Sequence, residues 1–274
     1  MLDGFQDLSF RPVRNDAPLR LTPAQIDAYN RKGFVQPIDI FPDSEIDGIR
    51  AYVDRLIADM GAEGNYGINC YQARLSGLWD IATDTRVLDH VQDIIGPDIL
   101  CWATAVLSKV PHDPKAVPWH QDAAFWSLSP ARTVTVWLAV DEATEANSAM
   151  RFLPGTHAGG ALKLRPASGA SVFHIETDGA DGLGEPFTNT LKAGQISLHA
   201  DMLVHGSLPN RSGRRRCGLT LRYCPPEVHV TDDAWARGVE AILCRGDAGN
   251  WRTYPRPDND DISRTASPHV VGNN

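Results

Sequence analysis

The chain has 274 residues, of which 42% are hydrophobic and 22% are charged, so it is long enough to bury a sizeable core and has a globular composition. Its formal charge of −8 argues against a nucleic-acid or anionic-membrane partner. The chain shows no signal-peptide pattern and no apolar run near the ~18 residues of a spanning helix. Five cysteines without a Cys-x-x-Cys pair favour a reduced, cytoplasmic protein with no zinc–thiolate site.

Three helices are predicted in the first part of the chain. Thr22, Pro23 and Gln25 form a capping-box pattern that starts a helix running to Gly33. A second helix begins at Asp43 or Ser44 and ends at Gly61, since its apolar residues recur at helical spacing. A third is expected from Asp84 to Ile95, with Gly96 ending it.

After Gly96 the pattern changes to short runs rich in β-branched and aromatic residues, such as "DILCWATAVLSKV", "RTVTVWLAV", "GQISLHADMLVHG" and "RRRCGLTLRY". This order predicts a mainly β fold with flanking helices, a jelly roll supported by N-terminal helices. We expect one domain, with a helical part at about 20–96, a jelly-roll core at about 97–228 and a C-terminal extension at 229–274. Residues 178–184, "DGADGLG", are predicted to be a flexible loop, and the polar C-terminal segment is predicted to pack loosely.

Three pairs with the spacing His-x-Asp or His-x-Glu are candidates for metal binding: His120/Asp122, His174/Glu176 and His199/Asp201. Residues i and i+2 of a strand point the same way, so the two side chains of a pair can reach one ion. His199 and His205 lie six residues apart, about 20 Å in an extended chain, and cannot share an ion with Asp201 unless the chain turns.

The pair His120/Asp122 has the most favourable surroundings. It follows a loop broken by three prolines, and Trp119, Phe125 and Trp126 supply apolar walls. His205 ends an apolar strand and is followed by an arginine-rich turn. Two histidines and one carboxylate from separate strands form a facial triad, which leaves three positions open on six-coordinate iron(II). We therefore predict structural or surface roles for the other two pairs.

An arginine eleven residues after His205 suggests a dicarboxylate site. Arg216 begins the strand "RCGLTLRY", and its planar guanidinium can bind a carboxylate in bidentate fashion. Alternation puts Arg216, Gly218 and Thr220 on a cavity face and the intervening Leu219, Leu221 and Tyr223 against helices. Arg222 shares the cavity face about 20 Å farther along the strand, and we interpret it as a structural ion-pair partner.

Together these segments resemble the phytanoyl-CoA dioxygenase-like iron(II)/2-oxoglutarate oxygenases. The resemblance rests on "WHQDAAFW", "TVTVWLAV", "NSAMRFLPGTH", "GQISLHADMLVHGSLPNRS" and "RRRCGLTLRY", which occur in the family's order between about Asp98 and Pro226. One departure is "NSAM", where Gly-Cys is more usual after the asparagine. The resemblance implies a double-stranded β-helix with His120, Asp122 and His205 as iron ligands. It further implies Arg216, Ser207 and Trp137 as the 2-oxoglutarate site.

The activity implied by the resemblance is hydroxylation of an unactivated C–H bond in a small molecule. O₂ is the oxidant, and 2-oxoglutarate is converted to succinate and CO₂. Halogenating relatives lack the carboxylate ligand, so the presence of Asp122 implies a hydroxylase. The C-terminal "VGNN" is not a peroxisomal signal.

Four further residues are candidates for substrate contacts: Phe125 and Trp126 beside the metal pair, and Asn69 and Gln72 in the loop "NYGINCYQARL". Two other functions stay open at this stage. A metal- or sugar-binding jelly roll without catalysis would not need Arg216. A zinc-dependent hydrolase would need a general base near the ligands, and the sequence offers no cue for one.

Overall fold

The computed structural model describes residues 6–268 and begins with the expected helices. The helix α1 spans Pro23–Lys32, and its capping box is confirmed because Thr22 and Gln25 bond reciprocally. The helix α2 spans Asp43–Met60 with Pro42 at its N-cap position, so neither the Asp43 nor the Ser44 side chain caps it. The helix α4 spans Thr85–Ile95, with the Asp84 carboxylate accepting from the Arg86 backbone N–H.

Two elements of this part were not predicted. The helix α3, Ser76–Ala82, has seven residues and no side-chain cap, so its sequence carries little signal. The strand β1, Phe34–Asp39, contains Pro37, and a proline within such a run weakens the prediction of a strand. It nevertheless pairs with β10 (Gln195–Ala200) at the edge of the main sheet.

Two antiparallel sheets make up the body of the protein. The large sheet has the order β1-β10-β5-β12-β2-β14 and the small sheet β3-β11-β6-β9. Two further pairs are β13-β4 and β7-β8. The remaining strands are β2 (Ile99–Lys109), β3 (Val117–His120), β4 (Leu128–Ser129), β5 (Val134–Ala139), β6 (Arg151–Phe152), β7 (Leu164–Pro166), β8 (Ile175–Thr177), β9 (Phe187–Thr188), β11 (His205–Ser207), β12 (Arg216–Cys224), β13 (His229–Val230) and β14 (Ile242–Arg245).

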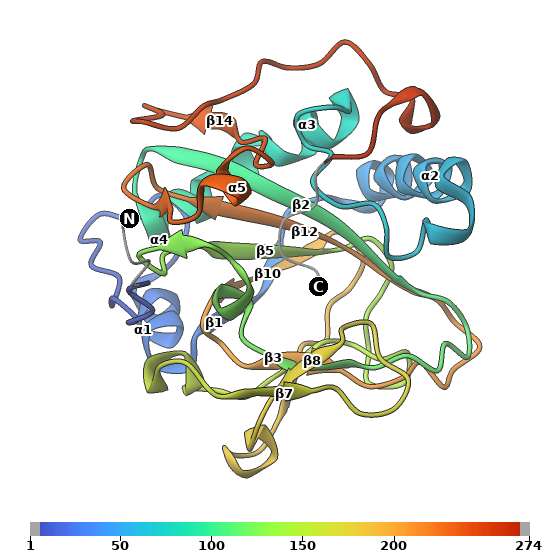
Figure 1. Ribbon diagram of the computed structural model, residues 1–274, viewed down its shortest axis with the longest axis horizontal. Helices are drawn as coiled ribbons and strands as arrows, with labels where there is room; N and C mark the ends of the chain where they lie inside the picture. The colour runs from blue at the N-terminus through green and yellow to red at the C-terminus, as the bar shows by residue number, and fades with distance from the viewer. Residues whose placement is uncertain (1–5, 269–274) are drawn as a thin grey trace.

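The sheets and helices are arranged in layers (Figure 1). The helices α2 and α3 lie on one side of β2 and β12, and the small sheet with β3 lies on the other side. This is the expected jelly roll, mainly β with flanking helices. Its large sheet also includes β1, from before residue 97, and β14, from after residue 228. The single domain and its division at about 97 and 228 stay predictions.

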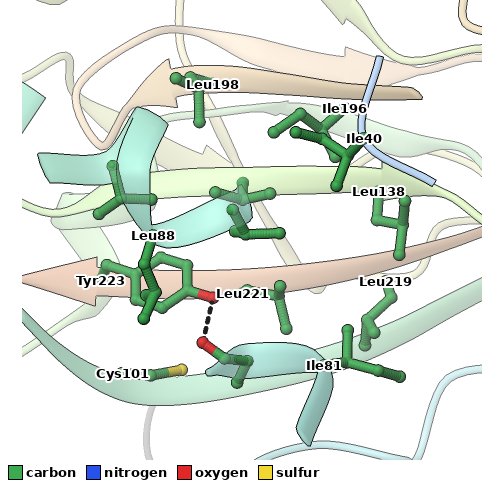
Figure 2. Packing of buried hydrophobic residues seen from close by; sticks show 14 of the residues in the cluster. Ile40, Ile81, Leu88, Cys101, Leu138, Ile196, Leu198, Leu219, Leu221 and Tyr223 are labelled. Atoms are coloured by element: carbon green, nitrogen blue, oxygen red, sulfur yellow. Dashed lines mark hydrogen bonds between the residues drawn. The ribbon is translucent and has the colours of Figure 1, made fainter. Parts of the chain in front are cut away.

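The face of β12 that points away from the small sheet supports the main hydrophobic core. Leu219, Leu221 and Tyr223 are fully buried there, as alternation predicted, and they pack with Ile81 of α3 and Leu88 of α4 (Figure 2). The Tyr223 hydroxyl donates a hydrogen bond of 2.9 Å to the carbonyl oxygen of Ala82, which ties the end of α3 to the sheet. The opposite face of β12 is thus left for a site.

Residues 178–184 contain a short 3-10 turn, Ala180–Gly182, in which Ala180 is buried and Asp181 accepts a hydrogen bond from the Trp119 indole. The flexibility of this loop stays a prediction. The prediction for the C-terminal segment needs correction. The C-terminal segment packs on the helices up to residue 268: a 3-10 turn at Ile262–Arg264 buries Ile262 in the main core. Residues 269–274 lie outside the described part. Within residues 6–268, no helix is long and apolar enough to cross a membrane.

Candidate active site

Three side chains from separate elements converge between the sheets. His120 ends β3, Asp122 begins the 3-10 turn Asp122–Phe125, and His205 begins β11. Antiparallel pairing places His205 directly opposite His120, so both imidazoles come from neighbouring strands. One ligand atom from each of the three buried side chains lies within 4.8 Å of the others. The nearer Asp122 oxygen, Oδ1, is 3.5 Å from His120 Nε2 and 4.0 Å from His205 Nε2.

Both imidazoles are oriented by the backbone. The Nδ1 atoms of His120 and His205 lie 2.9 Å from the carbonyl oxygens of Pro118 and Leu203, respectively. A carbonyl only accepts, so each Nδ1 carries the hydrogen and each Nε2 turns its lone pair toward Asp122. This tautomer is the one a metal ligand requires, and a backbone acceptor on the other nitrogen is its usual support. The three residues therefore fit a divalent metal ion with an open face.

The electrostatics of the cluster agree with that assignment. Burial raises the pKa of Asp122, but His205, His120 and Arg222 act against it and bring the pKa below the ordinary range. Burial lowers the pKa of His205 well below its usual value, with His120 adding to the effect. The Asp122 carboxylate is therefore held in its ionised form. The hydroxyl of Thr135 is 3.5 Å from the second Asp122 oxygen, Oδ2, and donates toward it.

Arg216, Ser207 and Trp137 line the same cavity as the triad. Arg216 is 2% exposed, and its guanidinium donates to Ser207 Oγ at 3.3 Å and to the Ser148 carbonyl at 3.1 Å. Its Cζ atom lies 5.7 Å from the centre of the Trp137 ring. Burial lowers the pKa of Arg216, since its charge is not offset by an ion pair within residues 6–268. A bound dicarboxylate would supply the missing negative charge.

Gly218 leaves room for the Trp137 side chain, which forms a wall of this cavity. A Cβ atom at this position would lie 2.1 Å from Cζ2 of Trp137, which no side chain can tolerate. The indole therefore contacts β12 at Gly218, between Arg216 and Thr220 along that strand. The glycine in "RCGLTLRY" is thus required by packing.

The four predicted substrate residues lie at different distances from the triad. Phe125 packs edge-on toward the His120 ring at 6.2 Å, and Trp126 stacks on Arg222 at 5.1 Å from its ring centre to Cζ. Gln72 is fully buried, and its amide is used by the carbonyls of Trp102 and Glu240 and by the Thr104 hydroxyl. These bonds give Gln72 a structural role, and a substrate contact by Gln72 stays a prediction. Asn69 forms an isolated bridge with Ala105 and does not line the cavity.

The other two His-x-acid pairs do not join the triad. Glu176 forms a surface ion pair with Arg165, and its neighbour His174 is exposed. Asp201 is buried and accepts a hydrogen bond from the Thr133 backbone N–H. His199 is buried too, with its ring 4.8 Å from that of His205, and neither ring nitrogen has a hydrogen-bond partner within residues 6–268.

Phe173 and Arg222 line the cavity, although neither was predicted to act there. Phe173 packs on the His120 ring with the centroids 4.9 Å apart, and it comes from the segment "SVFHIE", whose position over the triad depends on loop geometry. Arg222 lines the cavity and forms no ion pair within residues 6–268, so its interpretation as an ion-pair partner is wrong. Its place on the same face as Arg216 was the available signal.

A jelly roll that carries a His-Asp-His cluster beside a buried arginine defines a candidate mononuclear metal enzyme. The family model for phytanoyl-CoA dioxygenase (PhyH) matches residues 29–218, most of the chain. The protein therefore belongs to the phytanoyl-CoA dioxygenase family, as the resemblance implied.

Similar proteins agree with this assignment. Over 154 residues the chain is 30% identical to a probable alpha-ketoglutarate-dependent hypophosphite dioxygenase of Stutzerimonas stutzeri, covering 55% of this chain and 51% of that protein. It is 24% identical to the peroxisomal phytanoyl-CoA dioxygenase of Bos taurus, covering 57% and 48%. The chain thus spans about half the length of these curated relatives. Among solved structures, the non-heme monooxygenase ThoJ in its apo form superposes with a TM-score of 0.72 and 28% identity, covering 85% of this chain and 88% of that one.

Proposed function

We propose that the protein is an iron(II)- and 2-oxoglutarate-dependent dioxygenase that hydroxylates an unactivated C–H bond of a small molecule. The observation that carries this proposal is the pairing of two sites in one cavity. A cluster of three ligands with both histidine Nε2 atoms facing Asp122 lies beside a buried Arg216 that lacks an anion. Membership of a dioxygenase family and the name of the hypophosphite relative support it.

Each site would have its own task. His120, Asp122 and His205 would hold iron(II) on one face and leave the opposite face open to other ligands. Arg216 and Ser207 would bind the far carboxylate of 2-oxoglutarate, with Trp137 as the wall along it. When bound, iron(II) and 2-oxoglutarate supply the chemistry that activates O₂, with succinate and CO₂ as products.

The chain's remaining contribution is orientation and exclusion of water. The backbone carbonyls of Pro118 and Leu203 fix the histidine tautomers, so no proton rearrangement is needed when metal binds. Phe125 and Phe173 cover the His120 ring and keep that side of the cavity apolar. The retained carboxylate of Asp122 favours hydroxylation over halogenation. We also propose that the catalytic unit includes β1 and β14, because both strands complete the large sheet.

The test is anaerobic loading with iron(II) and 2-oxoglutarate, followed by visible absorption. We expect a weak metal-to-ligand charge-transfer band that disappears in His205→Ala. His174→Ala is the matched control, because this exposed histidine of another His-x-acid pair should leave the band unchanged. Absence of the band in the unaltered protein, together with tight zinc binding and hydrolytic turnover, would replace the oxygenase with a zinc hydrolase. A functional Arg216→Ala variant would instead favour a non-catalytic binding protein.

A further inference from the structure

Arg222 is a charged cavity residue that the proposed chemistry leaves without a role. It lies on β12 on the same face as Arg216 and Thr220, and all three line the cavity of the triad. Its backbone is opposite Thr135 of β5, whose hydroxyl reaches Asp122. Arg222 therefore stands at the metal end of the cavity, whereas Arg216 stands at the co-substrate end.

The guanidinium of Arg222 forms no ion pair in the described part of the chain, although its charge helps to lower the pKa of Asp122. Its Nε atom is buried and forms no hydrogen bond with any of residues 6–268. Nearby arginines behave differently: Arg214 pairs with Glu142 at 2.8 Å and Arg215 with Asp141 at 2.7 Å. Arg222 is half-buried, and a partly desolvated charge without an ion pair is costly, so an anion bound in the cavity would offset this cost.

Two tryptophans hold the Arg222 side chain in place. Its Cζ atom lies 5.1 Å from the ring centre of Trp126 and 5.9 Å from that of Trp102. The two indoles are themselves packed edge to face, 4.6 Å apart, and both are nearly inaccessible to solvent. Stacking against aromatic faces restrains the guanidinium plane but uses none of its N–H donors. The guanidinium N–H donors of Arg222 are therefore held in a fixed orientation before an anion binds.

The balance of charges in the cavity also indicates that Arg222 can bind an anion. A bound divalent ion would neutralise Asp122 and the metal-binding carboxylate of 2-oxoglutarate, and Arg216 would neutralise the far carboxylate. The positive charge of Arg222 is then left over. Phe173, Met150 and Val117 are apolar neighbours on the cavity wall and offer no negative charge.

We propose that Arg222 binds an anionic oxygen group of the primary substrate, a carboxylate or a phosphonate-like oxyanion, and so selects small anionic molecules. This inference rests on the proposed function, since it assigns the substrate class of the same site. Binding at the metal end of the cavity would anchor the substrate by its anionic group and leave its apolar part, with the C–H bonds, along the walls near the triad. Arg222 would then act as a specificity-determining residue.

The first experiment compares charged and neutral probes of the same size. Butyrate, ethylphosphonate and the neutral isostere butyramide are titrated against the full chain with manganese(II) and saturating 2-oxoglutarate, and intrinsic tryptophan fluorescence is recorded. We expect both anions to bind and to perturb the fluorescence of Trp102 and Trp126, and butyramide to bind far more weakly. Arg222→Gln should weaken anion binding about ten- to a hundredfold, as expected for a lost charged hydrogen-bond pair. Equal affinity for butyrate and butyramide, or unchanged binding in Arg222→Gln, would overturn the proposal.

Two further variants serve as controls. The first separates the geometry of the guanidinium from its charge, and the second tests for a general effect of surface arginines. Arg222→Lys keeps the positive charge but loses the planar set of donors, so it should fold and bind the anions with intermediate affinity. Arg214→Gln, a surface change on the preceding turn, should leave probe binding unchanged.

The affinity for 2-oxoglutarate decides whether Arg222 serves the substrate or the co-substrate. We expect it to fall in Arg216→Gln and to persist in Arg222→Gln. If the affinity for 2-oxoglutarate instead falls in Arg222→Gln and persists in Arg216→Gln, Arg222 binds the co-substrate and the inference is wrong. If the unaltered protein binds no 2-oxoglutarate but still binds butyrate through Arg222, the proposed function fails while the anion site stands.

Discussion

At the scale of single residues, the geometry of Arg216 should matter more than its charge. Its guanidinium donates to Ser148 and Ser207 from different nitrogens and stacks over Trp137, an arrangement that an ammonium group cannot reproduce. We expect Arg216→Lys to weaken 2-oxoglutarate binding by about tenfold or more, measured by titration of the anaerobic iron(II) complex. Arg214→Lys is the control, since Arg214 is an exposed neighbour. Equal loss in both variants would contradict a specific role for the guanidinium geometry of Arg216.

Asp201 is expected to make stability depend on pH. Burial raises the pKa of this carboxyl group to about 7. The folded state then holds a proton that the unfolded chain releases near pH 4, so the stability that this group contributes is present below pH 4 and is lost as pH rises to about 7. The mutation Asp201→Asn keeps an acceptor for the Thr133 N–H but has no charge to bury.

The measurement is the difference in Tm between Asp201→Asn and the unaltered protein across pH 4–8. Other titrating groups cancel in this difference. We expect it to grow toward neutral pH and to favour the variant by several degrees, as a change of roughly 1–3 kcal/mol gives in a chain of this size. A difference that stays constant across the range would show that Asp201 is ionised in the folded protein.

At the scale of elements, β12 joins the two halves of the molecule, because one face packs on helices and the other lines the cavity. Gly218 lies at the point where this strand approaches Trp137 most closely. We expect Gly218→Ala to cost roughly 1–3 kcal/mol of stability and to weaken 2-oxoglutarate binding, because its Cβ must push the indole out of place. Thermal unfolding and the anaerobic titration measure the two effects.

A matched control exists in the turn before the same strand. A Cβ atom at Gly213 would meet nothing within 4 Å, so Gly213→Ala should change neither quantity. If Gly218→Ala binds 2-oxoglutarate as well as the unaltered protein, Trp137 is not part of that site.

The elements show what a single sequence can and cannot predict. The cap at Thr22, the helix ending at Ile95 and the alternation along β12 depend on neighbours in sequence, and those predictions are confirmed. Strand β1 was missed because its place in the sheet is set by pairing with β10, about 160 residues away, rather than by its own composition.

The same distinction holds for the candidate site. The gathering of His120, Asp122 and His205 follows from local spacing and strand pairing, and the structure brings all three together. Arg222 was misread because its surroundings depend on Trp102 and Trp126, which come from two other parts of the chain. Whether a charged residue is paired or free is a tertiary property that strand alternation does not encode.

At the scale of the whole molecule, stability and binding are carried by opposite faces of the large sheet. The C-terminal segment lies on the helix side, where the Asp260 carboxylate accepts from the Tyr52 hydroxyl at 2.9 Å, Arg55 at 2.8 Å and the Gly77 backbone N–H at 3.0 Å. This one side chain links α2, the start of α3 and the C-terminal segment. The cavity lies on the other side of the sheet, and none of these residues lines it.

This separation predicts that Asp260→Ala lowers stability without weakening the site. We expect a loss of about 1–3 kcal/mol in the free energy of unfolding, since three hydrogen bonds are removed from a partly buried carboxylate. The affinity for 2-oxoglutarate should stay within about twofold, because β12 is held by its neighbours β2 and β5 rather than by the C-terminal segment. Asp258→Ala, an exposed position two residues earlier, should alter neither quantity. A fall in 2-oxoglutarate affinity that parallels the fall in stability would mean that the helical layer sets the geometry of the cavity through the sheet.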